Sequence, residues 1–537
     1  RIDSETVANP KHPAYGCVNN INKVIKDYDL VIATPTIETG VSIEEKHFDG
    51  VWGIFQGVST TDSVRQFLSR YRVPVPRYIW VKSTGIGFIG NKSTNFKALI
   101  ASERKLDKAN RSRLFDCGFE ETLDGNLEPI ALTTWAKLAA IINQGKWNYS
   151  EQVLHELEAE GHIIIDIDNS DDFIDSNDNE KIELPSENQA EKTKVEIDNN
   201  RDEQYQRHRE NVAQAESLND TAYEKLQKQQ SRNDDELLQL KKGKLERSYG
   251  VEVTPKLVHK DDDGWYPQIR LHYYFDVGRK FLKAREESVM NSALSNGNGE
   301  YFAPDTNKSL LGKKIDALDF LGINLLYKED KLHQNHPIIK DIFDKCKKNI
   351  YSLKLALGID FTNIKNRIEC VQRVLNLIGH KMPFIKKEGG RGKQIRIYGQ
   401  PSADFEYIVS KEKRKKILLD INGLPIPKLD GREEVFTTWI KRDIQAEKKA
   451  IEDKLKLEQQ KTTSQDECLT EEMLNTISQD LEYCKNAEML ADLRQIYPAK
   501  KLKSAFNFLA DDTKIKIKNW LSELKQAQKF KHSVNLC

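Results

Sequence analysis

The chain lacks several features that would assign it to a common class of protein. Its 83 basic and 83 acidic residues cancel, so overall charge does not indicate a nucleic-acid-binding protein, and any such signal must be regional. No apolar run approaches the ~18 residues of a membrane span, and the first residues carry no signal-peptide pattern. We therefore expect no membrane partner.

Cysteine is scarce and scattered. The seven cysteines form no CxxC pair, and an odd number in this arrangement argues against a disulfide framework or structural zinc. The pattern suits a reducing cytosol and predicts a cytoplasmic protein. His333, His336 and Cys346 lie near one another, but their spacing fits no standard zinc site, so no metal site is expected.

The N-terminal part alternates strand-like and helical segments. At 537 residues the chain is too long for one hydrophobic core. Within residues 1–100, strands are predicted at 28–35, 48–57 and 77–84, with a helix at 60–72. Strands that alternate with helices predict a parallel sheet with buried strands. The expected fold class is α/β here, followed by a mainly helical extension.

Composition divides the remainder of the chain. Residues 101–160 are predicted to be helical, and residues 161–200 are acidic, rich in Asn and Ser, and expected to be a disordered linker. Residues 201–310 should be helical with one strand-like segment, GWYPQIRLHYYFDVG. Residues 311–405 predict helices that end in a hairpin, and residues 406–537 a charged helical region. The aromatic residues of the strand-like segment are expected in the core, with a base-stacking platform as the alternative: Trp265, Tyr266, Tyr273 and Tyr274.

The segment ATPTIETGVS looks like a phosphate-handling loop. Thr34, Gly40 and Ser42 give the spacing T-x-x-x-x-x-G-x-S directly after a predicted strand. A glycine at such a position lets the backbone approach a ligand closely. The predicted helix at 60–72 then carries QFLSRYR, with Gln66 and Arg70.

In this order, the two segments resemble motifs V and VI of the second RecA-like domain of superfamily 2 helicases. The resemblance implies that Thr34 contacts the nucleic-acid backbone and that Gly40 and Ser42 lie near the nucleotide. It also implies that Gln66, Arg70 and Arg72 reach the phosphates of ATP bound across the cleft. A planar guanidinium can pair bidentately with the oxygens over which phosphoryl transfer spreads its charge.

The chain departs from the family pattern at three positions. Ser69 stands where motif VI usually has glycine, and Arg72 falls one residue before the usual second arginine. Arg77 therefore competes with Arg72 for that role. Ser42 stands where motif V usually ends in an acid. Arg70 is the strongest candidate of the motif.

The other half of an ATP site is missing from the sequence. No G-x-x-x-x-G-K-[ST] pattern occurs, and the nearest match, GGRGKQ at 389–394, falls in a predicted hairpin turn. In the helicase family the missing elements belong to the first RecA-like domain. We therefore expect the C-terminal part of a longer protein that binds ATP and Mg²⁺ as a whole, and a chain that is inactive by itself.

Longer stretches are similar to cyanobacterial plasmid replication proteins of the RepA type. These stretches are NPKHPAY, TPTIETGVSIE, FDGVWGIFQGV, SRYRVPVPRYIW and YGVEVTPKLVHKDDDGWYPQIRLHYYF. In that family a superfamily 2 helicase core precedes a long C-terminal extension, and the core distantly resembles herpesvirus origin-binding helicases. The resemblance covers much of residues 1–400 and implies replication initiation at a plasmid origin, with duplex and single-stranded DNA as partners and a possible homo-oligomer.

Residues 361–400 predict a helix followed by a basic hairpin. Gly379 ends a helix whose apolar positions recur at helical spacing. A helix followed by a basic hairpin is typical of a winged helix, in which the helix enters a groove and the hairpin contacts phosphates. The groove-facing candidates are Lys365, Arg367 and Arg373, and the hairpin candidates are Lys386, Lys387, Arg391, Lys393 and Arg396. A solvated charged hairpin is the alternative.

Two other functions remain open at this stage. The chain could be a non-enzymatic DNA-binding module in which the RecA-like part only scaffolds. It could also belong to a helicase-primase of a mobile element, which would need an acidic metal site elsewhere in the whole protein.

Overall fold

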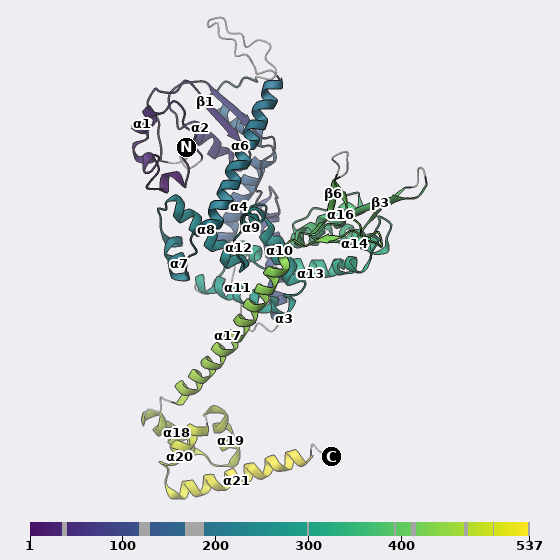
Figure 1. Cartoon of the computed structure of the whole chain (residues 1–537). Coiled ribbons are helices and arrows are strands. Elements are labelled where there is room, and N and C mark those ends of the chain that lie inside the picture. Colours follow the sequence, from purple (N-terminus) through teal and green to yellow (C-terminus); the bar gives the residue numbers. More distant parts are fainter. Residues whose placement is uncertain are drawn as a thin grey trace. The chain divides into compact units, whose positions relative to one another are not determined.

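The computed structural model describes residues 1–34, 40–116, 129–166, 187–297, 300–390, 394–409, 415–466, 471–497 and 499–534. Among these residues the chain is mostly helical, with one two-stranded parallel sheet and three two-stranded antiparallel sheets (Figure 1). It divides into two compact units, Arg1–Asp443 and Ile444–Cys537. The expected combination of an α/β part and a mainly helical extension is confirmed at this level. No helix in the described part is long and apolar enough to cross a membrane.

The parallel sheet forms where the sequence predicts it. Strands β1 (Val51–Phe55) and β2 (Arg77–Val81) pair in parallel, and helix α2 (Thr61–Leu68) connects them. The Thr60 hydroxyl accepts a hydrogen bond from the backbone N–H of Ser63 and so caps the helix. Short helical turns precede the sheet: η1 (Thr6–Ala8), η2 (Cys17–Asn20), α1 (Ile21–Val24) and η3 (Ile25–Asp27).

The expectation that these strands are buried on both faces is wrong. One face packs on α2 and α5, but Trp52 and Ile54 of β1 are 69% and 72% exposed. The predicted strand at 28–35 appears as an isolated parallel bridge between Ile2 and Ala33. Successive side chains of a strand point to opposite faces, and within the described residues only one face is covered.

Three helices follow the sheet, as predicted: α3 (Phe96–Asp116), α4 (Pro129–Trp147) and α5 (Tyr149–Ala159).

A buried lysine connects α4 to the loops that follow the two strands. Lys146 Nζ donates to the carbonyl oxygens of Gly57 (3.1 Å), Val58 (2.8 Å) and Ile86 (2.5 Å). The helical extension is therefore fastened at the carboxyl ends of β1 and β2.

The predicted linker is helical over part of its length. Residues 167–186 lie outside the described part, but helix α6 (Glu187–Gln214) includes residues 187–200, so the expectation of disorder is wrong there. Most of its side chains in that stretch are exposed. Ion pairs at helical spacing support it, such as Arg201–Asp198 at 2.8 Å. Low apolar content does not distinguish an exposed helix from an irregular chain.

The strand-like segment in the next region is also a helix. The elements here are α7 (Asp220–Lys228), α8 (Asp234–Tyr249), α9 (Pro255–Asp262), α10 (Trp265–Phe275), η5 (Arg279–Phe281), α11 (Leu282–Asn296) and α12 (Ala303–Ser309). Helix α10 buries Trp265, Ile269, Leu271, Tyr273 and Tyr274. Because a helix buried on most sides carries apolar residues all round, no clear 3.6-residue period is visible. The expectation that its aromatic residues form core is confirmed for Trp265, Tyr273 and Tyr274.

The following elements end in a hairpin: α13 (Gly312–Leu321), η6 (Ile323–Lys328), α14 (Pro337–Lys348), α15 (Ile350–Leu357), α16 (Arg367–Leu375), η7 (Asn376–Ile378), β3 (Phe384–Glu388) and β4 (Ile395–Tyr398). We call residues 312–398 the helix–hairpin unit. Strands β3 and β4 are antiparallel, and Leu332 forms an antiparallel bridge with Tyr398. The hairpin extends away from α14 and α16 (Figure 1). Gly379 adopts φ 65° where the helix ends, as its position in the sequence predicts.

The expectation of helix from residue 406 onward is wrong for the described residues up to 428. Short strands lie here instead: β6 (Tyr407–Val409), β7 (Lys415–Ile417) and β8 (Pro427–Lys428), which pairs with β5 (Asp404–Phe405). Gly423 at φ 72° and the nearby Pro425 and Pro427 interrupt a helix, because proline lacks the backbone N–H and glycine favours turns. The predicted helices begin at α17 (Arg432–Asp466).

The smaller unit has a core of its own. Helices α18 (Glu471–Tyr483), α19 (Ala487–Ile496), α20 (Ala499–Phe506) and α21 (Asp511–Val534) supply it. Ile477, Leu481, Leu490 and Ala505 are buried at its centre. This region is helical, as its charge pattern predicts.

Candidate functional site

The two segments that resemble helicase motifs lie against each other. Ile43 and Tyr71 form an isolated parallel bridge, and the backbone N–H of Arg72 donates to the Ile43 carbonyl oxygen at 2.8 Å. The Arg70 side chain turns back toward the loop, where its Nη1 donates to the Val41 carbonyl oxygen at 2.9 Å. Residues almost 30 positions apart therefore form one local site, with the Arg70 guanidinium against the loop backbone.

An asparagine from α1 fixes the loop from the other side. Asn22 Nδ2 donates to the Ser42 carbonyl oxygen at 3.0 Å, and Asn22 Oδ1 accepts from the backbone N–H of Glu44 at 2.9 Å. The Ser42 hydroxyl donates to the Glu44 carboxylate at 3.0 Å. Asn22 was missed in the sequence, because nothing in its local pattern indicates a partner 20 residues away.

Gly40 has a conformational role. Its φ of 75° lies in the left-handed region, which disfavours residues with a Cβ. Among the described residues, no heavy atom lies within 4 Å of the position that a Cβ would occupy. Thr34 is exposed, and residues 35–39, between it and Gly40, lie outside the described part.

The remaining motif residues divide into exposed and engaged side chains. Gln66 and Arg72 are exposed, and their side chains make no hydrogen bond or ion pair with the described residues. Arg77, the competitor of Arg72, donates through Nη2 to the Tyr71 carbonyl oxygen at 2.7 Å and through Nη1 to that of Val75 at 3.0 Å. Because Arg77 holds the turn after α2, its guanidinium is less available to a ligand than that of Arg72.

The hairpin carries two unpaired cations opposite each other. Lys387 and Arg396 are direct cross-strand partners, and both are exposed without an ion pair among the described residues. Direct cross-strand partners share a face of the sheet, where like charges are destabilising. Lys386, in contrast, pairs with Glu388 at 2.7 Å. Among the described residues of the hairpin, an anion is therefore most stabilising at the Lys387–Arg396 pair.

The arginines predicted on the helix already have partners. Arg367 Nη1 donates to Asn335 Oδ1 at 3.1 Å, and Arg373 pairs with Glu369 at 2.8 Å on the surface of α16. Lys365 is exposed, directly before the helix cap. Two further predicted hairpin residues lie outside the described part: Arg391 and Lys393.

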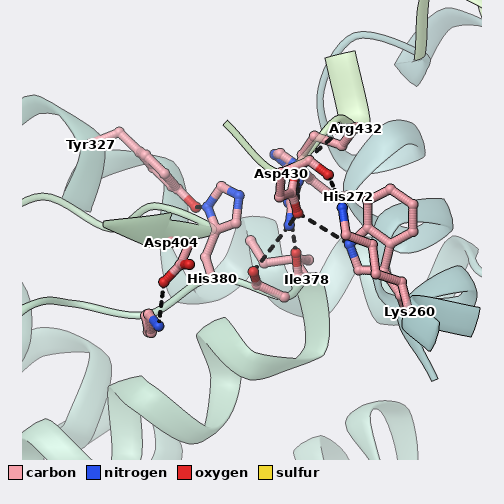
Figure 2. Close-up of polar contacts among 11 residues, drawn as sticks. Lys260, His272, Tyr327, Ile378, His380, Asp404, Asp430 and Arg432 are labelled. Carbon is pink, nitrogen blue, oxygen red and sulfur yellow. Dashed lines mark hydrogen bonds and ion pairs between the residues drawn. The ribbon is translucent and has the colours of Figure 1, made fainter. Parts of the chain in front are cut away.

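A buried polar junction joins the helix–hairpin unit to the start of α17 (Figure 2). Arg432 donates through Nη1 to the Ile378 carbonyl oxygen and through Nη2 to that of Gly379, both at 3.1 Å. It also pairs with Asp430 at 2.8 Å. Burial would raise the pKa of Asp430, but the hydrogen bonds and charge of Arg432 outweigh burial and lower it. Arg432 was not singled out in the sequence, because its partners lie far away along the chain.

Two histidines complete the junction. Arg432 Nη1 donates to His272 Nδ1 at 2.8 Å, and the rings of His272 and His380 are 4.5 Å apart. The Tyr327 hydroxyl lies 2.6 Å from His380 Nδ1. Burial, with the charge of Arg432, lowers the pKa of His380 to about 3, so this ring is neutral in the folded protein at neutral pH.

We expect the junction to lose stability in mild acid. Because the pKa of His380 is about 3 when folded and ~6.5 when unfolded, the unfolded state binds an extra proton between these values. Stability is then fully present above pH ~6.5 and falls as the pH drops, by about 2 kcal/mol at pH 5 for this residue. Urea unfolding at pH 7.5 and pH 5 measures the change. His380→Gln should lose part of this pH dependence, whereas the exposed His162→Gln should retain it. Equal pH dependence in all three proteins would contradict the prediction.

The chain is similar in sequence to a known protein. Over 447 residues the chain is 32% identical to an uncharacterized protein of Picosynechococcus sp., and the alignment covers 82% of this chain. The chain spans 40% of the length of that relative. No family model matches the chain. No solved structure matches it either.

Proposed function

We propose that the chain is the C-terminal part of a plasmid replication initiation protein with an ATP-dependent, superfamily 2 helicase core. The observation that carries the proposal is the contact between the two motif segments, in which Arg70 Nη1 donates to the Val41 carbonyl oxygen at 2.9 Å. The sequence similarity to RepA-type replication proteins supplies the biological context.

The chemistry of this site suits one half of a shared ATP site. Arg70 presents a guanidinium beside the loop that carries Gly40, and such a group can stabilise the charge that develops on a transferring phosphoryl group. A strand–helix–strand unit with parallel pairing is the building block of a RecA-like domain. The phosphate-binding lysine and the Mg²⁺-binding acid would come from a polypeptide outside these 537 residues, because no such motif occurs among them.

We further propose that the helix–hairpin unit acts as a winged helix on duplex DNA of the plasmid origin. Helix α13, the bridge at Leu332, helices α14, α15 and α16, and the β3–β4 hairpin occur in this order along the chain. Apart from the additional α15, a winged helix has helices and a final hairpin in the same order. In this proposal α16 reads the groove, and the hairpin contacts phosphates. Arg373 would exchange its partner Glu369 for DNA, and the opposed Lys387 and Arg396 would gain the anion that they lack.

The hairpin provides the direct test. Lys387→Glu/Arg396→Glu should weaken binding to duplexes of any sequence and should lower the salt dependence, at about 0.9 of a unit in the slope for each lost phosphate contact. The measurement is a salt titration of DNA affinity by fluorescence anisotropy. The exposed Lys225→Glu/Lys228→Glu on α7 gives the same change in net charge and serves as the control.

The outcome separates the proposal from its alternatives. If the hairpin double variant keeps the slope of the parent protein, the hairpin is only a solvated surface. If DNA binding depends on the hairpin but the whole protein hydrolyses no ATP, the non-enzymatic DNA-binding module is favoured. A primase-type acidic cluster elsewhere in the whole protein would favour the helicase-primase.

A further inference from the structure

A groove of about 950 Å³ lies in the larger unit, away from the motif segments. Its walls come from the loop at 88–93 and from helices α3, α12, α13 and α15, with Arg373 of α16 at one wall. This volume is at the upper end of the ~300–1,000 Å³ typical of ligand sites. The groove is large enough for a substantial ligand.

The groove is strongly basic. Six cations line it against two acids, Glu103 and Asp360; the cations are Lys92, Lys308, Lys313, Lys314, Lys354 and Arg373. Both acids are already engaged. Glu103 is buried and accepts from Asn307 Nδ2 at 3.0 Å, and Asp360 pairs with Lys354 at 2.6 Å. Lys313 and Arg373 pair with acids outside the lining, Asp316 at 3.5 Å and Glu369 at 2.8 Å. The remaining positive charge on the walls therefore comes from Lys92, Lys308 and Lys314.

Three of the lysines form no direct ion pair, although the charge of Lys308 acts on the buried Glu103 carboxylate. The side chains of Lys92, Lys308 and Lys314 make no ion pair or hydrogen bond with the described residues. Lys314 is half-buried, and burial together with the charge of Arg270 lowers its pKa. Desolvated ammonium groups of this kind are stabilised by a negatively charged ligand.

Exposed aromatic rings accompany the lysines. Trp147 is 50% exposed, and its indole Nε1 donates to the Lys92 carbonyl oxygen at 3.3 Å. Tyr351 is 54% exposed, and Lys105 Nζ lies 4.5 Å from the centre of its ring. Cations beside accessible aromatic rings are the combination that binds single-stranded nucleic acids, since every base can stack on such a ring.

The backbone at Lys92 is unusual. Its φ of 68° makes it the one non-glycine residue with a positive φ in the described part of the chain. A long side chain in this region is less favourable than glycine or asparagine. Local strain of this kind clusters at binding sites, where it projects a side chain in a fixed direction. Here it holds a lysine at the edge of the groove.

We propose that this groove binds single-stranded DNA, with the lysines on phosphates and Trp147 and Tyr351 stacking on bases. The proposal rests on the proposed function, because the strand would come from duplex DNA held by the helix–hairpin unit. Arg373 connects the two surfaces, since it lies on α16 and also lines the groove. The aromatic rings favour a nucleic-acid strand over an acidic peptide, because bases stack on such rings whereas an acidic peptide requires only the cations.

The test is binding of a fluorescein-labelled oligo(dT) of about 16 nucleotides to the 537-residue chain. Lys92→Glu/Lys308→Glu should lower the salt dependence by about 1.4 units of slope, at about 0.7 for each lost phosphate contact. Trp147→Ala and Tyr351→Ala should each weaken binding on the order of tenfold with an unchanged slope. Lys97→Glu/Lys108→Glu on α3 is the control, because it has the same net charge and both residues are exposed outside the groove.

Each outcome decides the matter. Equal losses in the groove and control variants would overturn the proposal, as would affinity that none of the variants changes. If dTMP displaces the oligonucleotide at equal molar concentration, the groove takes a mononucleotide and the proposal is wrong. The hairpin variant Lys387→Glu/Arg396→Glu separates the two proposals. This variant should lose duplex binding but keep oligo(dT) binding. If its duplex binding is unchanged, the proposal for the hairpin is wrong and the proposal for the groove is unaffected.

Discussion

Arg70→Ala in the full-length protein should reduce DNA-stimulated ATP turnover on the order of 10³-fold, the loss expected for an arginine finger. The Arg70 guanidinium lies beside the motif loop and donates a hydrogen bond to the Val41 carbonyl oxygen at 2.9 Å. From there it can stabilise the charge that builds up on the transferring phosphoryl group. DNA affinity without nucleotide should change little. Steady-state ATPase assays and DNA binding on the same preparations give both quantities.

Arg72→Ala is the matched comparison for this prediction. Arg72 is exposed, so its substitution should not disturb the fold. Its effect on ATP turnover tests whether Arg72, one residue before the usual second arginine of motif VI, takes that role. Because Arg70 also contacts the loop, its substitution could lower ATP turnover by destabilising the fold. Thermal unfolding of Arg70→Ala at the same temperature as the parent protein would exclude this explanation. If neither variant changes ATP turnover, the assignment of this segment to motif VI is wrong.

Arg432→Met should destabilise the larger unit by about 3–5 kcal/mol, the cost of breaking a buried ion pair from one side. The substitution leaves Asp430 buried without its guanidinium and removes the donors from the Ile378 and Gly379 carbonyl oxygens. Trp265 Nε1, which donates to Asp430 at 3.1 Å, compensates only part of that charge. Urea unfolding followed by circular dichroism measures the loss.

Two further variants sharpen this prediction. Arg432→Met/Asp430→Leu should recover much of the lost stability, because apolar groups of similar volume can replace a buried pair at little cost. Arg207→Met breaks an exposed pair with Glu203 and should cost less than about 1 kcal/mol. A loss at Arg432 as small as that at Arg207 would show that the junction does not hold the unit together.

Local sequence signals determined a substantial part of this structure. The strand–helix–strand unit at 51–81, helix α4 and the β3–β4 hairpin form where their periodicity and capping residues predict them. Thr60 at the start of α2 and Gly379 at the end of a helix act within a few residues, and so their effects can be read locally. The resemblance of two segments to helicase motifs also rests on local signals, because each segment is a contiguous pattern.

The tertiary structure decided the features that depend on distant partners. Helix α10 carries no visible helical period because nearly every side of it is buried, and α6 is helical despite a composition typical of a linker. Arg432 meets carbonyl groups more than 50 positions away, and Asn22 meets the motif loop 20 residues on. The groove joins Lys92, Lys308 and Trp147 from three separate segments. Local propensity and residue spacing do not predict such contacts, because the contacts form only when distant segments pack together and exclude water.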